Sequence, residues 1–113
     1  MSTVRLLRED VHSEVWRVKN AIMSICENAH VYVFGSALDP IAAHVRDLDF
    51  LITIPKESHF KTMRQKILCD IPRTEWALDL IVVPAEFLEK KRQEGGNFYF
   101  YAFQEGIHLD ETA

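Results

Sequence analysis

The sequence has little cysteine, glycine or proline and no long hydrophobic run. Its 113 residues include four glycines and four prolines, which excludes collagen-like and low-complexity architectures. The longest apolar stretches, around 50–55 and 78–84, are far too short to cross a bilayer. The charged N-terminal segment does not resemble a secretory signal. We therefore expect a cytoplasmic protein without a membrane partner, in which the two cysteines, Cys26 and Cys69, are reduced and buried.

A surplus of basic charge is also missing. Thirteen lysines and arginines face 17 acidic residues, giving a formal net charge of −4. The strongest basic cluster, residues 90–92, is flanked by glutamates and is typical of a solvated helix face. Proteins that bind a nucleic-acid backbone usually carry a basic patch or stripe, so we do not expect polymeric nucleic acid as a partner. A small anion chelated by a metal stays open.

The remaining composition is typical of an ordinary globular protein. The composition is 48% hydrophobic and 27% charged, and neither an internal repeat nor a linker occurs. The length suits one hydrophobic core, so we expect a single domain over residues 1–113. The five histidines share no metal-ligand spacing, and we expect them at the surface or rim.

Hydrophobic periodicity and turn residues predict alternating helices and strands. Helices are expected over about 10–28, 40–44, 58–70 and 85–93, and strands over 30–34, 47–54 and 76–83. For the aromatic segment 97–106 both helix and strand are tenable, and we favour helix. This segment either covers the sheet or forms an exposed interface. The pattern predicts an α/β (α+β) fold in which helices cover a small β-sheet on at least one face.

Three carboxylates lie in strands that otherwise favour burial. Asp47 and Asp49 begin one predicted strand, and Asp79 lies among apolar residues in the next. Side chains two apart in a strand point to the same face, so Asp47 and Asp49 project side by side. If the two strands are neighbours, three like charges converge and repel, which raises their pKa values. A hard divalent cation such as magnesium removes that conflict.

A short segment before these carboxylates has the chemistry of an anion-binding loop. Gly35-Ser36 follows a predicted strand, precedes a short predicted helix and stands ten residues before Asp47. Such a junction directs backbone N–H groups and one hydroxyl toward a shared point, where they hold phosphate well. The anion cradle and the metal ligands therefore follow each other along one stretch of chain.

This constellation resembles the polymerase-β-like nucleotidyltransferase superfamily, and within it the single-domain minimal nucleotidyltransferases that act as antitoxins. The resemblance covers nearly the whole chain and implies a small mixed β-sheet flanked by helices. It further implies that Asp47, Asp49 and Asp79 hold two Mg²⁺ ions and are the catalytic residues, and that Gly35 and Ser36 bind the phosphates of a nucleoside triphosphate.

The resemblance also implies a reaction. A hydroxyl attacks the α-phosphorus and pyrophosphate leaves, so that a nucleoside monophosphate, most plausibly AMP from ATP, is transferred. Asp79 would also help to deprotonate the hydroxyl. The acceptor would be a hydroxyl on a helical HEPN-type toxin, which makes the protein resemble an antitoxin of a toxin–antitoxin system.

Two departures from the family pattern keep alternatives open. Ala37-Leu38-Asp39-Pro40 replaces the usual small-Arg-Gly stretch, and Arg46 replaces a serine. Arg46 either reaches a phosphate, as a nucleotide-binding residue, or is only a charged neighbour of Asp47. The alternatives are a partner-binding antitoxin or scaffold without catalysis, and a transferase for a small molecule such as an antibiotic. Self-association into an oligomer also stays open.

Overall fold

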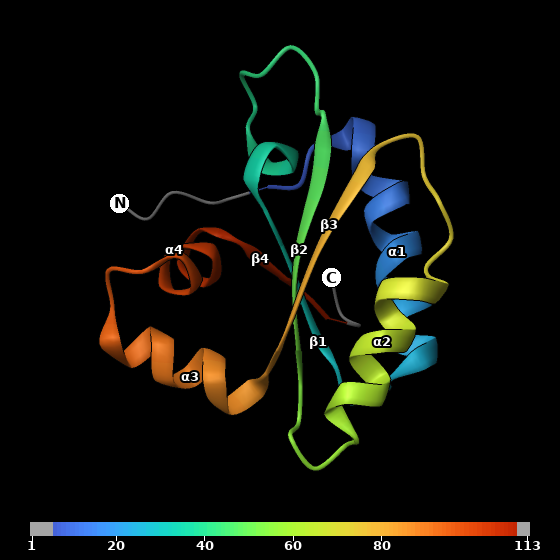
Figure 1. Cartoon of the computed structure of the whole chain (residues 1–113). Helices are drawn as coiled ribbons and strands as arrows, with labels where there is room; N and C mark the ends of the chain where they lie inside the picture. Colours follow the sequence, from blue (N-terminus) through green and yellow to red (C-terminus); the bar gives the residue numbers. More distant parts are fainter. Residues whose placement is uncertain (1–5, 111–113) are drawn as a thin grey trace.

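The computed structural model describes residues 6–110, which form a four-stranded mixed sheet flanked by helices (Figure 1). This confirms the predicted α+β class. The elements in chain order are η1 Glu9–Val11, α1 His12–Ile25, β1 His30–Phe34, η2 Gly35–Leu38, β2 Asp47–Ile54, α2 Phe60–Asp70, β3 Ala77–Pro84, α3 Ala85–Glu94, α4 Phe98–Glu105 and β4 Ile107–Leu109, where η denotes a 3₁₀ helix.

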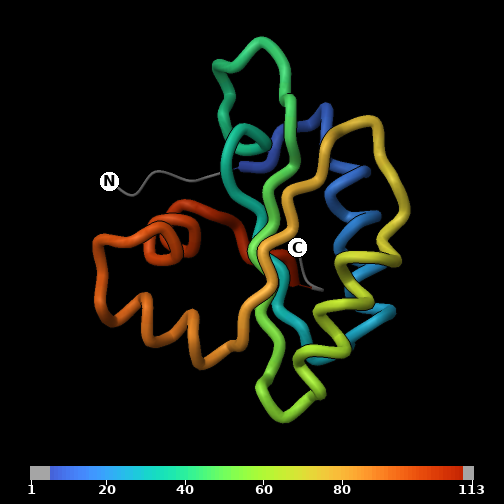
Figure 2. Tube along the Cα trace, in the orientation of Figure 1, coloured from blue at the N-terminus to red at the C-terminus, as the bar shows by residue number. Residues whose placement is uncertain are grey.

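The strand order is β3-β2-β1-β4, and only the β2–β3 pair is parallel. Parallel neighbours need a crossover, which α2 provides. Because β1 runs antiparallel to β2, the end of β1 and the starts of β2 and β3 meet at one end of the sheet (Figure 2). All six residues of the predicted site belong to this end.

Alternation along the strands divides the apolar side chains between two layers. Leu48, Phe50, Ile52 and Ile54 are fully buried in the larger layer, against α1 and α2. Leu51 packs in a smaller layer beneath α3 and α4, together with Val83, Leu88 and Ala102. Figure 1 shows the two helix pairs on opposite sides of the sheet. Odd-numbered residues of β2 therefore face α3 and α4.

The helix expected over 40–44 does not form, and this prediction is wrong. Residues 39–46 are an irregular loop instead. The Asp39 carboxylate accepts a hydrogen bond from the Ile41 N–H at 2.9 Å, which closes a local turn. The Arg8 guanidinium donates hydrogen bonds to the carbonyl oxygens of Asp39 and Ala42, which holds the segment in this loop. Ile41 is 89% exposed, so this apolar side chain does not anchor the segment to the core.

Two further expectations need correction. Cys26 is buried, but Cys69 is exposed, because α2 directs Phe60, Met63 and Ile67 toward the core and turns Cys69 away from it. The short strand β4 was not expected; it pairs with β1 through three residues. The aromatic segment 97–106 is mainly helical, as favoured. Over residues 6–110, no helix combines the length and apolar character needed to cross a membrane.

Candidate active site

The three carboxylates lie next to one another on one face of the sheet. Asp49 stands directly opposite Asp79 in the parallel β2–β3 ladder, and Asp47 precedes Asp49 by two positions. All three therefore point to the face that α3 and α4 cover further along the strands. Asp47 and Asp79 are exposed and Asp49 is half-buried. The sheet thus gathers the predicted ligands at its uncovered end.

The three carboxylates lie together without an ion-paired basic partner among residues 6–110. Burial raises the pKa of the Asp49 carboxyl above its ordinary value, and the charges of Asp79 and then Asp47 raise it further. Over residues 6–110, none of the three carboxylates forms an ion pair or a side-chain hydrogen bond. Three mutually repelling acids at one strand end are an unfavourable arrangement unless a cation binds there.

Gly35 packs directly against this cluster. A Cβ atom at Gly35 would lie 2.4 Å from Asp49 Oδ2, and the backbone has a φ of +79°. Only glycine meets both conditions without strain. Phe34, the preceding residue, stands opposite Asp49 in the β1–β2 ladder. The candidate phosphate loop and the carboxylates are therefore in contact.

Ser36 and Arg46 flank the carboxylates in different ways. The Ser36 hydroxyl donates to the carbonyl oxygen of Asp47 at 3.3 Å, which joins η2 to the start of β2. Arg46 is exposed and, within the described residues, has no ion pair. Its guanidinium is free to reach an anion, but no contact places it in the cluster. The structure therefore brings five of the six predicted residues together and leaves Arg46 at the edge.

An aromatic border was not recognised from the sequence. The Phe34 ring shares the sheet face of Asp49 and meets the Phe98 ring edge-on, with centroids 5.7 Å apart. Phe98 is 51% exposed. The hydrophobic pattern of α4 indicated an aromatic segment, but the contact between β1 and α4 joins residues 64 positions apart. An aromatic, apolar surface consequently stands beside the acidic cluster.

Arg8 is a second residue that the sequence reasoning missed. Besides holding the 39–46 loop, its guanidinium pairs with Asp10 at 2.9 Å. Its backbone N–H donates to the carbonyl of Ala37 at 2.9 Å. Arg8 precedes Asp39 by 31 residues and Ala42 by 34, so local sequence patterns do not predict these contacts. Arg8 therefore holds the first half of the segment that connects Ser36 with Asp47.

The donor set of the site suits magnesium. Carboxylate oxygens with open positions for water and phosphate are the ligands that Mg²⁺ prefers. As the side chains stand, no three Asp, Glu, His or Cys groups within residues 6–110 are close enough to hold an ion. Asp47, Asp49 and Asp79 share one face on adjacent positions, so rotation about their side-chain bonds would be needed to turn them toward a common ion.

The five histidines are exposed, as expected, and two of them are in side-chain contact. His30 Nδ1 lies 3.2 Å from His108 Nε2, on the neighbouring strands β1 and β4. Burial lowers the pKa of the His108 imidazole, and the nearby His30 lowers it further. This pair lies at the other end of β1 from Gly35 and takes no part in the acidic cluster.

Comparison with known proteins adds no assignment. No protein-family model matches the chain, and no curated protein matches it.

Proposed function

We propose that the protein is a magnesium-dependent nucleotidyltransferase that transfers a nucleoside monophosphate, namely AMP from ATP, to a hydroxyl. One observation carries the proposal: Gly35 is packed against Asp49, and Asp49 stands opposite Asp79 on the neighbouring strand. A triphosphate held by the loop would therefore lie beside the carboxylates that could bind its metal ions.

Each residue has a role that follows from its position. Gly35 and Ser36 would bind the outer phosphates through backbone N–H groups and the hydroxyl. Asp47 and Asp49 would hold two Mg²⁺ ions, and Asp79 one of them. Magnesium, when bound, neutralises the triphosphate and favours ionisation of the attacking hydroxyl.

The transfer forms one bond to phosphorus and breaks another. The acceptor oxygen forms a bond to the α-phosphorus, the bond from that phosphorus to the pyrophosphate oxygen breaks, and pyrophosphate leaves. Asp79 is exposed at the mouth of the cluster and would take the proton of the acceptor hydroxyl.

The acceptor would come from a protein partner. The carboxylates lie at an open end of the sheet, and the exposed rings of Phe98 and Tyr101 lie on α4, with Phe98 bordering the cluster through Phe34. Exposed aromatic side chains are enriched where proteins bind one another. By the family resemblance, the partner would be a helical HEPN-type toxin that is silenced by AMP.

The test is transfer of radioactive label. The protein is incubated with ATP labelled at the α-phosphorus, with magnesium and either a cell lysate or a co-expressed helical partner. We expect a labelled protein band with the native chain and a loss of about a thousandfold in rate with Asp49→Asn, because a two-metal site loses a ligand. Asp110→Asn, a change of the same kind away from the cluster, serves as the control.

Equal labelling by the native chain and by Asp49→Asn would disprove the proposed site. No labelling with any of the four nucleotides, together with stable capture of the partner, would support the scaffold without catalysis. The same exposed rings of Phe98 and Tyr101 are the observation that favours this second function.

A further inference from the structure

A cleft lies at the opposite end of β3 from the acidic cluster. It has a volume of about 630 Å³ and opens where the loop after β2, the start of α2 and the start of α3 meet. Pro84, the last residue of β3, is five positions from Asp79, which corresponds to roughly 17 Å along a strand. The cleft is therefore separate from the proposed active site.

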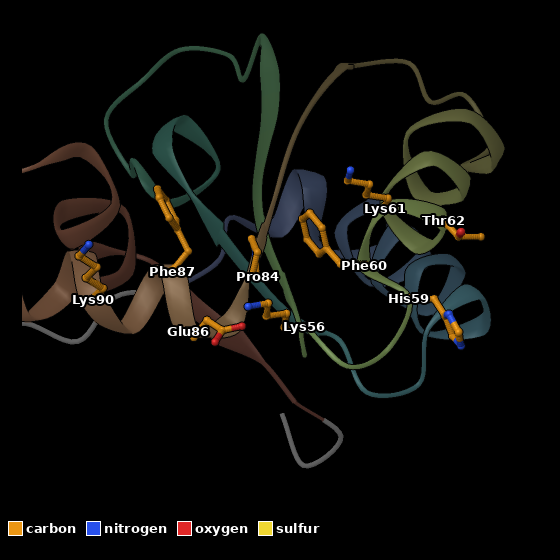
Figure 3. A pocket seen from close by; sticks show the side chains of 9 residues that line it. All are labelled: Lys56, His59, Phe60, Lys61, Thr62, Pro84, Glu86, Phe87 and Lys90. Carbon is orange, nitrogen blue, oxygen red and sulfur yellow. The ribbon is translucent and has the colours of Figure 1, made fainter.

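Apolar side chains form much of the cleft. Figure 3 shows the ring of Phe60, at the start of α2, and the ring of Phe87, in α3, on either side of Pro84. All three side chains are partly exposed, so their apolar surfaces are accessible. Two aromatic rings and a proline provide flat surfaces suited to an aromatic or other apolar body.

Positive charge surrounds this apolar surface. Lys56, Lys61 and Lys90 line the cleft, against one carboxylate, that of Glu86. Within residues 6–110, none of the three lysines forms an ion pair or a hydrogen bond. In an acidic protein of net charge −4, three unpaired ammonium groups around one cleft form a local site for a negative group.

The neighbouring basic residues of α3 behave differently. Lys91 pairs with Glu94 at 3.3 Å, and Arg92 pairs with Glu89 at 2.8 Å. The sequence pattern predicted this neutralised helix face for the whole cluster at 90–92. Lys90 is the exception, because within the described residues it forms no such pair and instead lines the cleft at the far side of Phe87 (Figure 3).

We propose that this cleft binds a small organic anion with a flat apolar body, such as an aromatic carboxylate, sulfonate or phosphate. The apolar body lies against Phe60, Pro84 and Phe87, and the anionic group lies among the lysine ammonium groups. The volume falls within the range of about 300–1,000 Å³ that is typical of small-molecule sites, which favours a small ligand over an extended peptide.

The test uses two fluorescent probes with nearly the same body and different charge. Anilinonaphthalene sulfonate carries the anionic group, and N-phenylnaphthylamine lacks it. We expect the full chain to bind the sulfonate at least several-fold more tightly, with amide NMR shifts at residues 56–61 and 84–90. Magnesium and nucleotides are omitted, so failure of the proposed transferase activity does not affect the result.

A matched pair of variants locates the anionic group. Lys61→Gln removes a lysine of the cleft, whereas Lys66→Gln removes an exposed lysine of the same helix that does not line it. We expect Lys61→Gln to weaken sulfonate binding by about threefold, the scale of one partly exposed charge, and Lys66→Gln to leave it unchanged. Neither variant should alter binding of the uncharged probe.

Several outcomes would overturn the proposal. Equal affinity for the two probes would show that the lysines do not select an anion. Equal effects of Lys61→Gln and Lys66→Gln, or NMR shifts centred away from the cleft, would place binding elsewhere. An acidic peptide with one aromatic residue that displaces the sulfonate better than naphthalene sulfonate does would indicate a protein-docking groove instead.

Discussion

Gly35 is the residue on which the geometry of the acidic site depends most directly. We predict that Gly35→Ala costs about 2–3 kcal/mol, because it combines a left-handed backbone with a Cβ placed 2.4 Å from Asp49 Oδ2. Gly95→Ala, whose backbone has a φ of +70° and a ψ of 167° but open space around it, should cost less, about 1–2 kcal/mol, from backbone strain alone. Urea unfolding of both variants measures the difference.

A double-mutant cycle separates the two causes. In an Asp49→Ala background the clash partner is gone, so the cost of Gly35→Ala should fall toward that of Gly95→Ala. An unchanged cost in that background would mean that Gly35 and Asp49 are not in contact.

The protonation of Asp49 gives a second prediction at this scale. Its pKa is raised in the folded state, so the folded chain binds this proton more tightly than the unfolded chain. Asp49 therefore lowers stability above the raised pKa, and this penalty disappears as the pH falls below the unfolded value of 3.8. We predict that Asp49→Asn stabilises the protein at pH 7 by up to about 1 kcal/mol and has little effect near pH 3.

Asp10 serves as a control, because its pKa is shifted in the opposite direction to that of Asp49. Its hydrogen bond to Arg8 lowers the pKa of its carboxyl, so its contribution is present above pH 3.8 and is lost as the pH falls. Asp10→Asn should destabilise at pH 7 and lose its effect in acid. Thermal unfolding from pH 3 to pH 7 compares the two variants, and parallel profiles would contradict the assignment.

Among the elements, α3 and α4 are joined through one side chain. Asn97 accepts a hydrogen bond from the Phe100 N–H at 3.0 Å, which caps α4. Its amide also donates to the carbonyls of Lys91 at 2.8 Å and Gly95 at 3.2 Å, at the end of α3. Both helices therefore depend on it for their junction.

We predict that Asn97→Ala costs about 1–2 kcal/mol, since a helix cap and two further hydrogen bonds are lost. Asn97→Asp keeps the acceptor for Phe100 and loses the donors, so it should recover part of the loss. Chemical denaturation followed by circular dichroism measures both. A neutral Asn97→Ala would show that the junction does not depend on these bonds.

Local sequence patterns predicted most of the strands and helices, because alternation and helical spacing depend on neighbouring residues. The pairing of Asp49 with Asp79 could be expected only if their strands were adjacent, and the fold makes them so. The 39–46 loop could not be predicted, because Arg8 competes for its carbonyls from a distant part of the chain. The His30–His108 contact likewise joins residues 78 apart.

For the whole molecule, the proposed function predicts a coupling between stability and ligand. A ligand that binds only the folded chain stabilises it by about 2.7 kcal/mol at a concentration of 100 times its Kd. For a chain of this size, that corresponds to a rise in Tm of roughly 10 °C. We predict such a rise with magnesium and ATP together, measured by differential scanning fluorimetry.

The controls follow from the site. ATP with a chelator should give a much smaller rise, and Asp49→Asn should abolish the effect. Lys61→Gln, a change in the separate cleft, should leave it intact. A rise that persists in Asp49→Asn would show that ATP binds somewhere other than the acidic cluster.

The residue-by-residue pairing of β2 with β3 also limits where insertions and deletions can occur in the chain. Side chains alternate between the two layers at every step, so one extra residue between Leu78 and Asp79 would reverse the orientation of the strand on one side of it. Either Asp79 would enter the apolar layer under α1 and α2 while Leu80 and Val82 leave it, or Leu78 would leave that layer. Related chains should therefore vary in length within 39–46 or 71–76, and keep an invariant length of β3 from Ala77 to Pro84.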